Sequence, residues 1–178
     1  IVIPQQHAGR TVLAFFWADN SLNSNLRNNI RTMMQGLQAM KDSAALLVYW
    51  DGEASDISWP EPCIVEYVTN GQGGINSMSK EAVNAMIADQ DMSVHDLISI
   101  GNIRKKYPPQ TSTEKTVMQT VIGDMMSVYP SESYGIIFGS HGSGWLPTIT
   151  GTRSIGQDGG RYSSDTALIP ELAEVLRT

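Results

Sequence analysis

Residues 11–51 decide the fold, and they read TVLAFFWADNSLNSNLRNNIRTMMQGLQAMKDSAALLVYWD. The stretch opens and closes with short apolar, β-branched and aromatic runs, TVLAFFW at 11–17 and AALLVYW at 44–50, which predict two buried strands. Between them, apolar side chains recur at steps of three and four residues, which predicts an amphipathic helix over 22–40 with a methionine-rich core stripe. Strand, helix and strand in this order form a βαβ unit, so the sequence predicts a parallel sheet in an α/β fold.

The rest of the chain continues this alternation. We expect a strand at 63–68, helices at 79–89 and over part of 93–106, a helix behind the S/T-x-x-E capping box of 111–114, a strand at 135–138, a loop at 146–164 and a helix at 167–177. Cys63 begins a predicted strand of mostly apolar residues, and we interpret it as a residue that packs in the core. Residues 1–10 are predicted as an N-terminal extension and residues 11–178 as one α/β domain, with 146–164 as a flexible loop.

The composition excludes several classes of function. The net charge is −6 with only 12 Lys and Arg residues, which argues against a nucleic-acid-binding protein, because such proteins need a basic face. One cysteine allows no intrachain disulfide, and three widely separated histidines without a CxxC or HExxH spacing argue against a zinc site. No apolar run approaches the length of a membrane span.

The segment that carries chemistry is YGIIFGSHGSGW at 134–145. A buried strand runs into Gly139-Ser140-His141-Gly142, and ligands of parallel sheets bind at the carboxyl ends of strands. A histidine there can act as general acid or base near neutral pH, and we expect the N–H of Gly142 to face the same space, as an oxyanion donor requires. The residues alone leave open a second interpretation, in which His141 only hydrogen-bonds a turn.

The same segment resembles the histidine motif of the clostripain family, peptidase family C11 in the caspase-like clan CD of cysteine peptidases. The opening TVLAFFWADNSL at 11–22, the strand end LVYWDG at 47–52 and QDG at 157–159 are also similar to that family. The resemblance spans most of residues 11–177. It implies an α/β, caspase-like three-layer sandwich with a mostly parallel sheet flanked by helices, here incomplete.

The resemblance also implies a function. A cysteine endopeptidase with a His–Cys dyad would cleave peptide bonds after Arg or Lys, with His141 as the catalytic histidine and Gly142 as an oxyanion donor. Trp145 would line the substrate site, or anchor the structure. The residues themselves require no cofactor, although some relatives use calcium and no DxDxDG loop occurs here. The resemblance further implies a bacterial, exported enzyme at the cell surface, in the periplasm or secreted.

No cysteine follows His141 in this chain, so the dyad is incomplete. Three explanations stay open: the cysteine lies in a second polypeptide after proteolytic maturation, the sequence covers part of a longer protein, or the chain is an inactive homologue. In the first two, another strand is expected beside Tyr134–Phe138, and the isolated chain is expected to be poorly soluble. Asp19 and Asp51, which end strands, are interpreted as capping and turn residues.

Rival functions rest on weaker patterns. Gly71-Gln72-Gly73-Gly74 lacks the GxGxxG form of a nucleotide site, and Gly139-Ser140-His141-Gly142 is not the GxSxG turn of a serine hydrolase. The remaining alternative is a non-catalytic interaction domain that derives from the peptidase fold.

Overall fold

A computed structural model describes residues 8–40, 44–52, 61–141, 154–158, 165–168 and 174–177. The elements in chain order are β1 (Ala8–Trp17), α1 (Asn23–Ala39), β2 (Ala44–Asp51), β3 (Cys63–Val68), α2 (Lys80–Ala88), α3 (Val94–Ile100), β4 (Asn102–Lys106), α4 (Lys115–Val128), β5 (Ser131–Gly139), β6 (Ser154–Asp158) and β7 (Asp165–Leu168). Among these residues no helix is both long enough and apolar enough to cross a bilayer.

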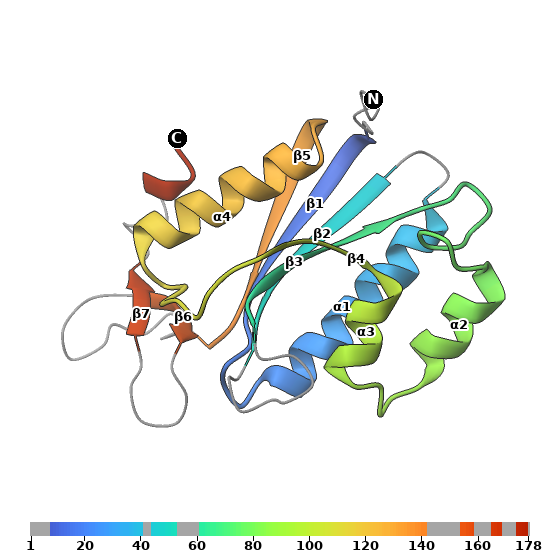
Figure 1. The fold of residues 1–178 in the computed structure, drawn as a ribbon, viewed down its shortest axis with the longest axis horizontal. Helices are drawn as coiled ribbons and strands as arrows, with labels where there is room; N and C mark the ends of the chain where they lie inside the picture. Colours follow the sequence, from blue (N-terminus) through green and yellow to red (C-terminus); the bar gives the residue numbers. More distant parts are fainter. Residues whose placement is uncertain are drawn as a thin grey trace.

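The five strands β1–β5 form one sheet in the order β4-β3-β2-β1-β5 (Figure 1). β1 pairs in parallel with β2 and β5, whereas β3 is antiparallel to both β2 and β4. Four of the five strands therefore point the same way and only β3 is reversed. The prediction of a mostly parallel sheet is confirmed.

The sheet carries a core on each face. β1 supplies both, since Ala14 and Phe16 join the cluster under α1, α2 and α3, while Leu13, Phe15 and Trp17 join the one under α4. Figure 1 shows α4 on one side of the sheet and the other three helices on the opposite side. A strand that is buried on both faces needs apolar residues at every position, which explains the uninterrupted run at 11–17. The three-layer sandwich is confirmed.

Helix α1 buries the predicted apolar stripe. Leu26, Ile30, Met34 and Leu37 are buried, and Met33 packs against the same cluster. Met40 lies just beyond the helix and is 43% exposed, so the stripe ends one turn earlier than its periodicity indicates.

The prediction of a helix over part of 93–106 is confirmed, since α3 covers Val94–Ile100. Gly101 ends α3 against β3, where a Cβ would lie 2.2 Å from Cγ1 of Val65, and residues 102–106 form the edge strand β4. All five β4 residues are exposed, so the strand has no alternating apolar pattern that the sequence could reveal.

The capping box predicted at 111–114 does not form. α4 begins at Lys115 with Glu114 in the N-cap position, and Glu114 makes no side-chain cap hydrogen bond. A capping box forms instead at the start of α3, where Ser93 and Asp96 exchange hydrogen bonds. The Ser112 hydroxyl is engaged by Asp51 on β2, a contact 61 residues away along the chain.

The C-terminal part also differs from its prediction. Residues 154–158, expected within a loop, form β6, which pairs antiparallel with β7 where a helix was predicted to begin. Val175 is buried in the cluster under α4, and Lys115 of α4 pairs with Glu174. Residues 174 and 175 are therefore packed against α4.

β5 is an edge strand in the described part of the chain, because it pairs with β1 alone. Tyr134, Ile136 and Phe138 pack under α4, but Ile137 on the opposite face is 41% exposed. An unpaired edge with an exposed apolar side chain favours pairing with another strand. The structure thus leaves the place beside Tyr134–Phe138 open, where a further strand was expected.

We expect residues 1–178 alone to self-associate through this edge, and Ile137→Lys to reduce the self-association, because a charged side chain on an edge strand opposes pairing. Sedimentation or light scattering over a range of concentrations measures it. Ile103→Lys is the matched control, since Ile103 is equally exposed at 41% on the already basic edge strand β4. A monomeric wild-type fragment that unfolds cooperatively would contradict this expectation.

Glu66 on β3 is a buried carboxylate, with 2% of its surface exposed. Its Oε2 lies 3.3 Å from a guanidinium nitrogen of Arg104 on the neighbouring strand. Burial raises the pKa of Glu66 above its ordinary value, and Arg104 and Asn102 offset this only in part. A raised folded-state pKa means that the folded protein holds this proton to higher pH than the unfolded chain. The contribution of Glu66 to the free energy of unfolding therefore falls as pH rises.

Glu66→Gln is expected to weaken the pH dependence of the free energy of unfolding. At pH 7–8 the variant of the complete protein should be more stable than wild type, and this difference should disappear as pH falls through the range in which carboxyl groups become protonated. Urea unfolding at several pH values measures the difference. Glu61→Gln is the control, because the side chain of Glu61 is 49% exposed in its pair with Lys106. If the free energy of unfolding of wild type and of Glu66→Gln depended on pH in the same way, the ionisation of Glu66 would not contribute as described.

Candidate functional site

His141 lies at the carboxyl end of β5, two residues beyond the end of the strand. The register pairs Phe16 of β1 with Gly139, and Trp17 of β1 with Asp51 of β2, so the carboxyl ends of three parallel strands meet here. Only glycine fits at position 139, because a Cβ would lie 2.6 Å from the Phe16 ring and 2.7 Å from Leu26. The histidine therefore follows a strand end that is pressed closely against β1 and α1.

The turn from Ala18 to Asn23, between β1 and α1, is held by its own hydrogen bonds. Asn20 donates from Nδ2 to the carbonyl of Trp17 at 2.6 Å and accepts at Oδ1 from the N–H of Leu22 at 2.9 Å. Asn23 Nδ2 donates to the carbonyl of Ala18 at 3.2 Å. The N–H of Ala18 in turn donates to the carbonyl of Asp51 at 2.6 Å. The turn is thus tied to the ends of both β1 and β2.

This turn contacts His141 directly. The Ser21 hydroxyl lies 2.9 Å from Nε2 of His141, and Asn20 Nδ2 donates to the Ser140 hydroxyl at 3.3 Å. From the other side, the N–H of Gly156 in β6 donates to the His141 carbonyl at 2.9 Å. Within the described residues Nδ1 of His141 makes no hydrogen bond. The described side-chain contact of the imidazole is therefore made at Nε2, to a residue of the turn, and both interpretations of His141 stay open.

Gly156 brings β6 to the site through close packing. Its φ is +86°, a conformation that favours glycine, and a Cβ on it would lie 3.1 Å from the Trp17 ring. In Figure 1 the β6–β7 hairpin lies at the same end of the sheet as the end of β5. The hairpin thus covers Trp17 and supports the backbone of His141.

Asp51 ends β2 and is buried, with 5% of its surface exposed. The Ser112 hydroxyl donates to its Oδ2, and Ser112 is itself 2.7 Å from the Tyr49 hydroxyl, which accepts from Gln110 Nε2 at 3.0 Å. The carboxylate therefore fastens the segment before α4 to the end of β2. This agrees with a structural role for Asp51. Asp19 lies in the turn after β1.

Of the three predicted site residues, the structure places only His141. Gly142 and Trp145 lie outside the described residues, so their predicted roles stay predictions. The described part of the chain contains no group of three or more His, Cys, Asp or Glu side chains suited to a metal ion, and the use of calcium stays a prediction. Sequence reasoning missed Ser21 and Asn20, because a contact across 120 residues leaves no local pattern.

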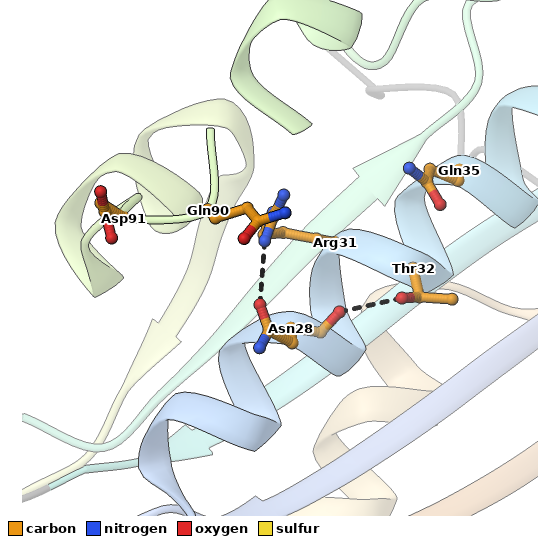
Figure 2. A pocket seen from close by; sticks show the side chains of 6 residues that line it. All are labelled: Asn28, Arg31, Thr32, Gln35, Gln90 and Asp91. Atoms are coloured by element: carbon orange, nitrogen blue, oxygen red, sulfur yellow. Dashed lines mark hydrogen bonds between the residues drawn. The ribbon is translucent and has the colours of Figure 1, made fainter. Parts of the chain in front are cut away.

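A hollow that does not include His141 lies between α1 and the segment that follows α2. It has a volume of about 400 Å³ and is lined by Asn28, Arg31, Thr32, Gln35, Gln90 and Asp91. Figure 2 shows that Arg31 extends from α1 toward Gln90 and hydrogen-bonds Asn28. Its guanidinium also donates to the carbonyl of Ile87 near the end of α2. Arg31 thus satisfies a carbonyl at a helix terminus, which is a structural role.

Comparisons with known proteins found a matching family and several similar solved structures. The model of the clostripain family matches residues 14–178. A secreted C11 cysteine protease from Bacteroides thetaiotaomicron, solved in complex with an irreversible peptide inhibitor, superposes with a TM-score of 0.65 at 25% identity. The match covers 96% of this chain but only 39% of that one, so this chain spans well under half of that relative.

A second solved structure is of similar size to this chain. A B. fragilis cysteine protease matches at 27% identity and a TM-score of 0.55, over 79% of this chain and 95% of that one. No curated protein matches the sequence.

Ser112→Ala is expected to lower the free energy of unfolding by about 1–3 kcal/mol, because the buried Asp51 carboxylate would lose a hydrogen-bond donor. Ser99→Ala serves as the control, since the Ser99 hydroxyl donates to a backbone carbonyl on the exposed surface of α3, and we expect it to change stability by less than about 0.5 kcal/mol. Urea unfolding of the complete protein measures both. Equal effects of the two substitutions would rule out Asp51 as an anchor of this segment.

Proposed function

Because this chain belongs to the clostripain family, we propose that it supplies the histidine of a cysteine endopeptidase whose thiol lies outside these 178 residues. The family match over residues 14–178 and the two cysteine-protease relatives support the class of enzyme. The relative from B. thetaiotaomicron was solved with an irreversible peptide inhibitor, which supports a peptide substrate for this chain.

The observation that carries the proposal is the position of His141 at the carboxyl end of an edge strand. β5 pairs with β1 alone among the described strands. Adjacent strands lie about 4.8 Å apart, so a further parallel strand beside β5 would end next to the imidazole. A cysteine at the end of that strand would come within reach of His141, which is the arrangement that a His–Cys dyad needs.

The reaction follows from this arrangement. The imidazole accepts the proton of the thiol, and the thiolate attacks the carbonyl carbon of the scissile peptide bond. The N–H of Gly142 donates to the oxyanion that forms. The imidazolium then gives its proton to the leaving amine as the C–N bond breaks, which leaves a thioester. Water, deprotonated by the imidazole, hydrolyses that thioester and restores the thiol.

The cysteine lies either in a downstream segment of the same polypeptide or in a second polypeptide that stays associated. Coverage of only 39% of one relative indicates how much more protein such an enzyme contains. In either form the β5 edge is the place where the missing strand docks.

Cleavage after Arg or Lys is the specificity that the family implies, and it needs an acidic group in the substrate pocket. Asp51 is buried and accepts a hydrogen bond from Ser112, so we assign the pocket acid to the segment that carries the cysteine. Trp145 lines the pocket in this proposal. We further propose that the enzyme is bacterial and exported, to the cell surface, the periplasm or the medium, because the first relative is a secreted protease.

The alternative is a non-catalytic interaction domain that keeps the peptidase fold. It predicts the same fold and the same open edge, but no thiol-dependent hydrolysis. The two differ in whether the complete protein hydrolyses a peptide.

In the complete protein, His141→Ala should reduce the hydrolysis of fluorogenic peptides with Arg or Lys before the scissile bond by about 10²–10⁴-fold, because it removes the general acid and base. Peptides with Asp or Ala at that position should be poor substrates, and a thiol alkylating agent should abolish the activity. His95→Ala is the control, as His95 is an exposed residue of α3. Activity that survives alkylation, or the absence of any peptidase activity, would favour the alternative.

A further inference from the structure

We propose that Ser21 is a positioning residue for His141: its hydroxyl accepts a hydrogen bond from Nε2–H and so leaves Nδ1 as the nitrogen that exchanges protons with the cysteine. The inference rests on the proposed peptidase function for its chemistry. Its geometry stands on the contact of 2.9 Å between Ser21 Oγ and His141 Nε2.

The Ser21 contact belongs to a two-point attachment. Asn20 and Ser21 are neighbours in the turn after β1, and they meet Ser140 and His141, which are neighbours after β5, at 3.3 and 2.9 Å. Two adjacent contacts fix the rotation of one segment relative to the other, whereas a single contact does not. The imidazole is therefore oriented by β1, the central strand of the three parallel strands.

Ser21 sits on a rigid support. The side chain of Asn20 closes the turn at the carbonyl of Trp17 and the N–H of Leu22, and the N–H of Ala18 is bonded to β2. His141 is supported in its turn by the bond from Gly156 to its carbonyl. The residues that flank Ser21 and the carbonyl of His141 are therefore held by hydrogen bonds, which favours the preorganisation that a catalytic group requires.

The chemistry decides the direction of the hydrogen bond. If the Ser21 hydroxyl accepts from Nε2–H, neutral His141 carries its lone pair at Nδ1 and can take the thiol proton there. The resulting imidazolium keeps the same Nε2–H donor, so the bond persists and stabilises the charged form. If the hydroxyl donated instead, Nδ1 would already hold the proton and the thiol could not be deprotonated.

The kinetic test compares Ser21→Ala, Ser21→Thr and wild type in the complete protein. Loss of the acceptor should lower kcat/KM by about 10-fold, mainly through kcat, and move the basic limb of the pH profile to lower pH, because the imidazolium loses a partner. Ser21→Thr should restore much of the activity and the position of the limb. Ser127→Ala is the matched control, since its hydroxyl bonds a backbone carbonyl on α4, away from the site.

A second measurement does not depend on activity. ¹⁵N shifts of the imidazole, recorded on protein with labelled histidine, distinguish an Nε2–H from an Nδ1–H ring. Wild type should show the Nε2–H form at alkaline pH, and Ser21→Ala should shift the population or the Nε2 resonance.

These two readouts separate the two hypotheses. Wild-type protein without thiol-dependent hydrolysis overturns the peptidase function, and the ¹⁵N shifts still decide the role of Ser21. Active wild type with an unchanged pH profile and unchanged ¹⁵N shifts in Ser21→Ala overturns the positioning role alone. An Nδ1–H ring in wild type overturns it as well.

Discussion

The structure depends on β1 being paired on both edges and buried on both faces. The strand joins β2 on one side and β5 on the other, in parallel and without a break in register over most of its length. Its side chains enter both hydrophobic clusters, so it also fixes the distance between the two helical layers. The site contacts this strand at three places. Gly139 packs against Phe16, β6 packs against Trp17, and the turn after Trp17 contacts the imidazole. The position of His141 is thus set by packing in the centre of the protein.

The parts of the fold that local pattern determines were predictable from sequence. Apolar patterns predict three of these elements, namely the strands at 11–17 and 44–50 and the helix α1. A strand buried on both faces requires a continuous apolar run, and a helix buried on one face requires an apolar stripe. β4 was missed because all its residues are exposed, and β6 and β7 because short paired strands in a polar segment have no apolar period. These elements are specified by their partners in space.

The candidate site divides in the same way. His141 was predicted as a site residue because a buried strand that ends in Gly-Ser-His-Gly is an unusual local pattern, and the resemblance to a family implied its role. Ser21 was noted only within the family-like stretch 11–22, and Ser112 only as part of a capping box that does not form. Each of these hydroxyls is used by a residue on a distant strand. A hydroxyl has the same local appearance in a cap, a turn or a site, and only tertiary contact distinguishes these uses.

The contacts of the C-terminal part have a consequence for covalent continuity. β6 is bonded to the backbone of His141 through Gly156, β7 is bonded to β6, and Val175 is buried beneath α4 with Glu174 paired to Lys115. A single break of the backbone between β6 and β7 would leave β6 bonded to His141, and the piece with β7 would stay attached through the β6–β7 pairing, Val175 and the Lys115–Glu174 pair. Cleavage at that point would break a peptide bond without releasing either piece. The contacts that surround the imidazole would persist in the cleaved protein.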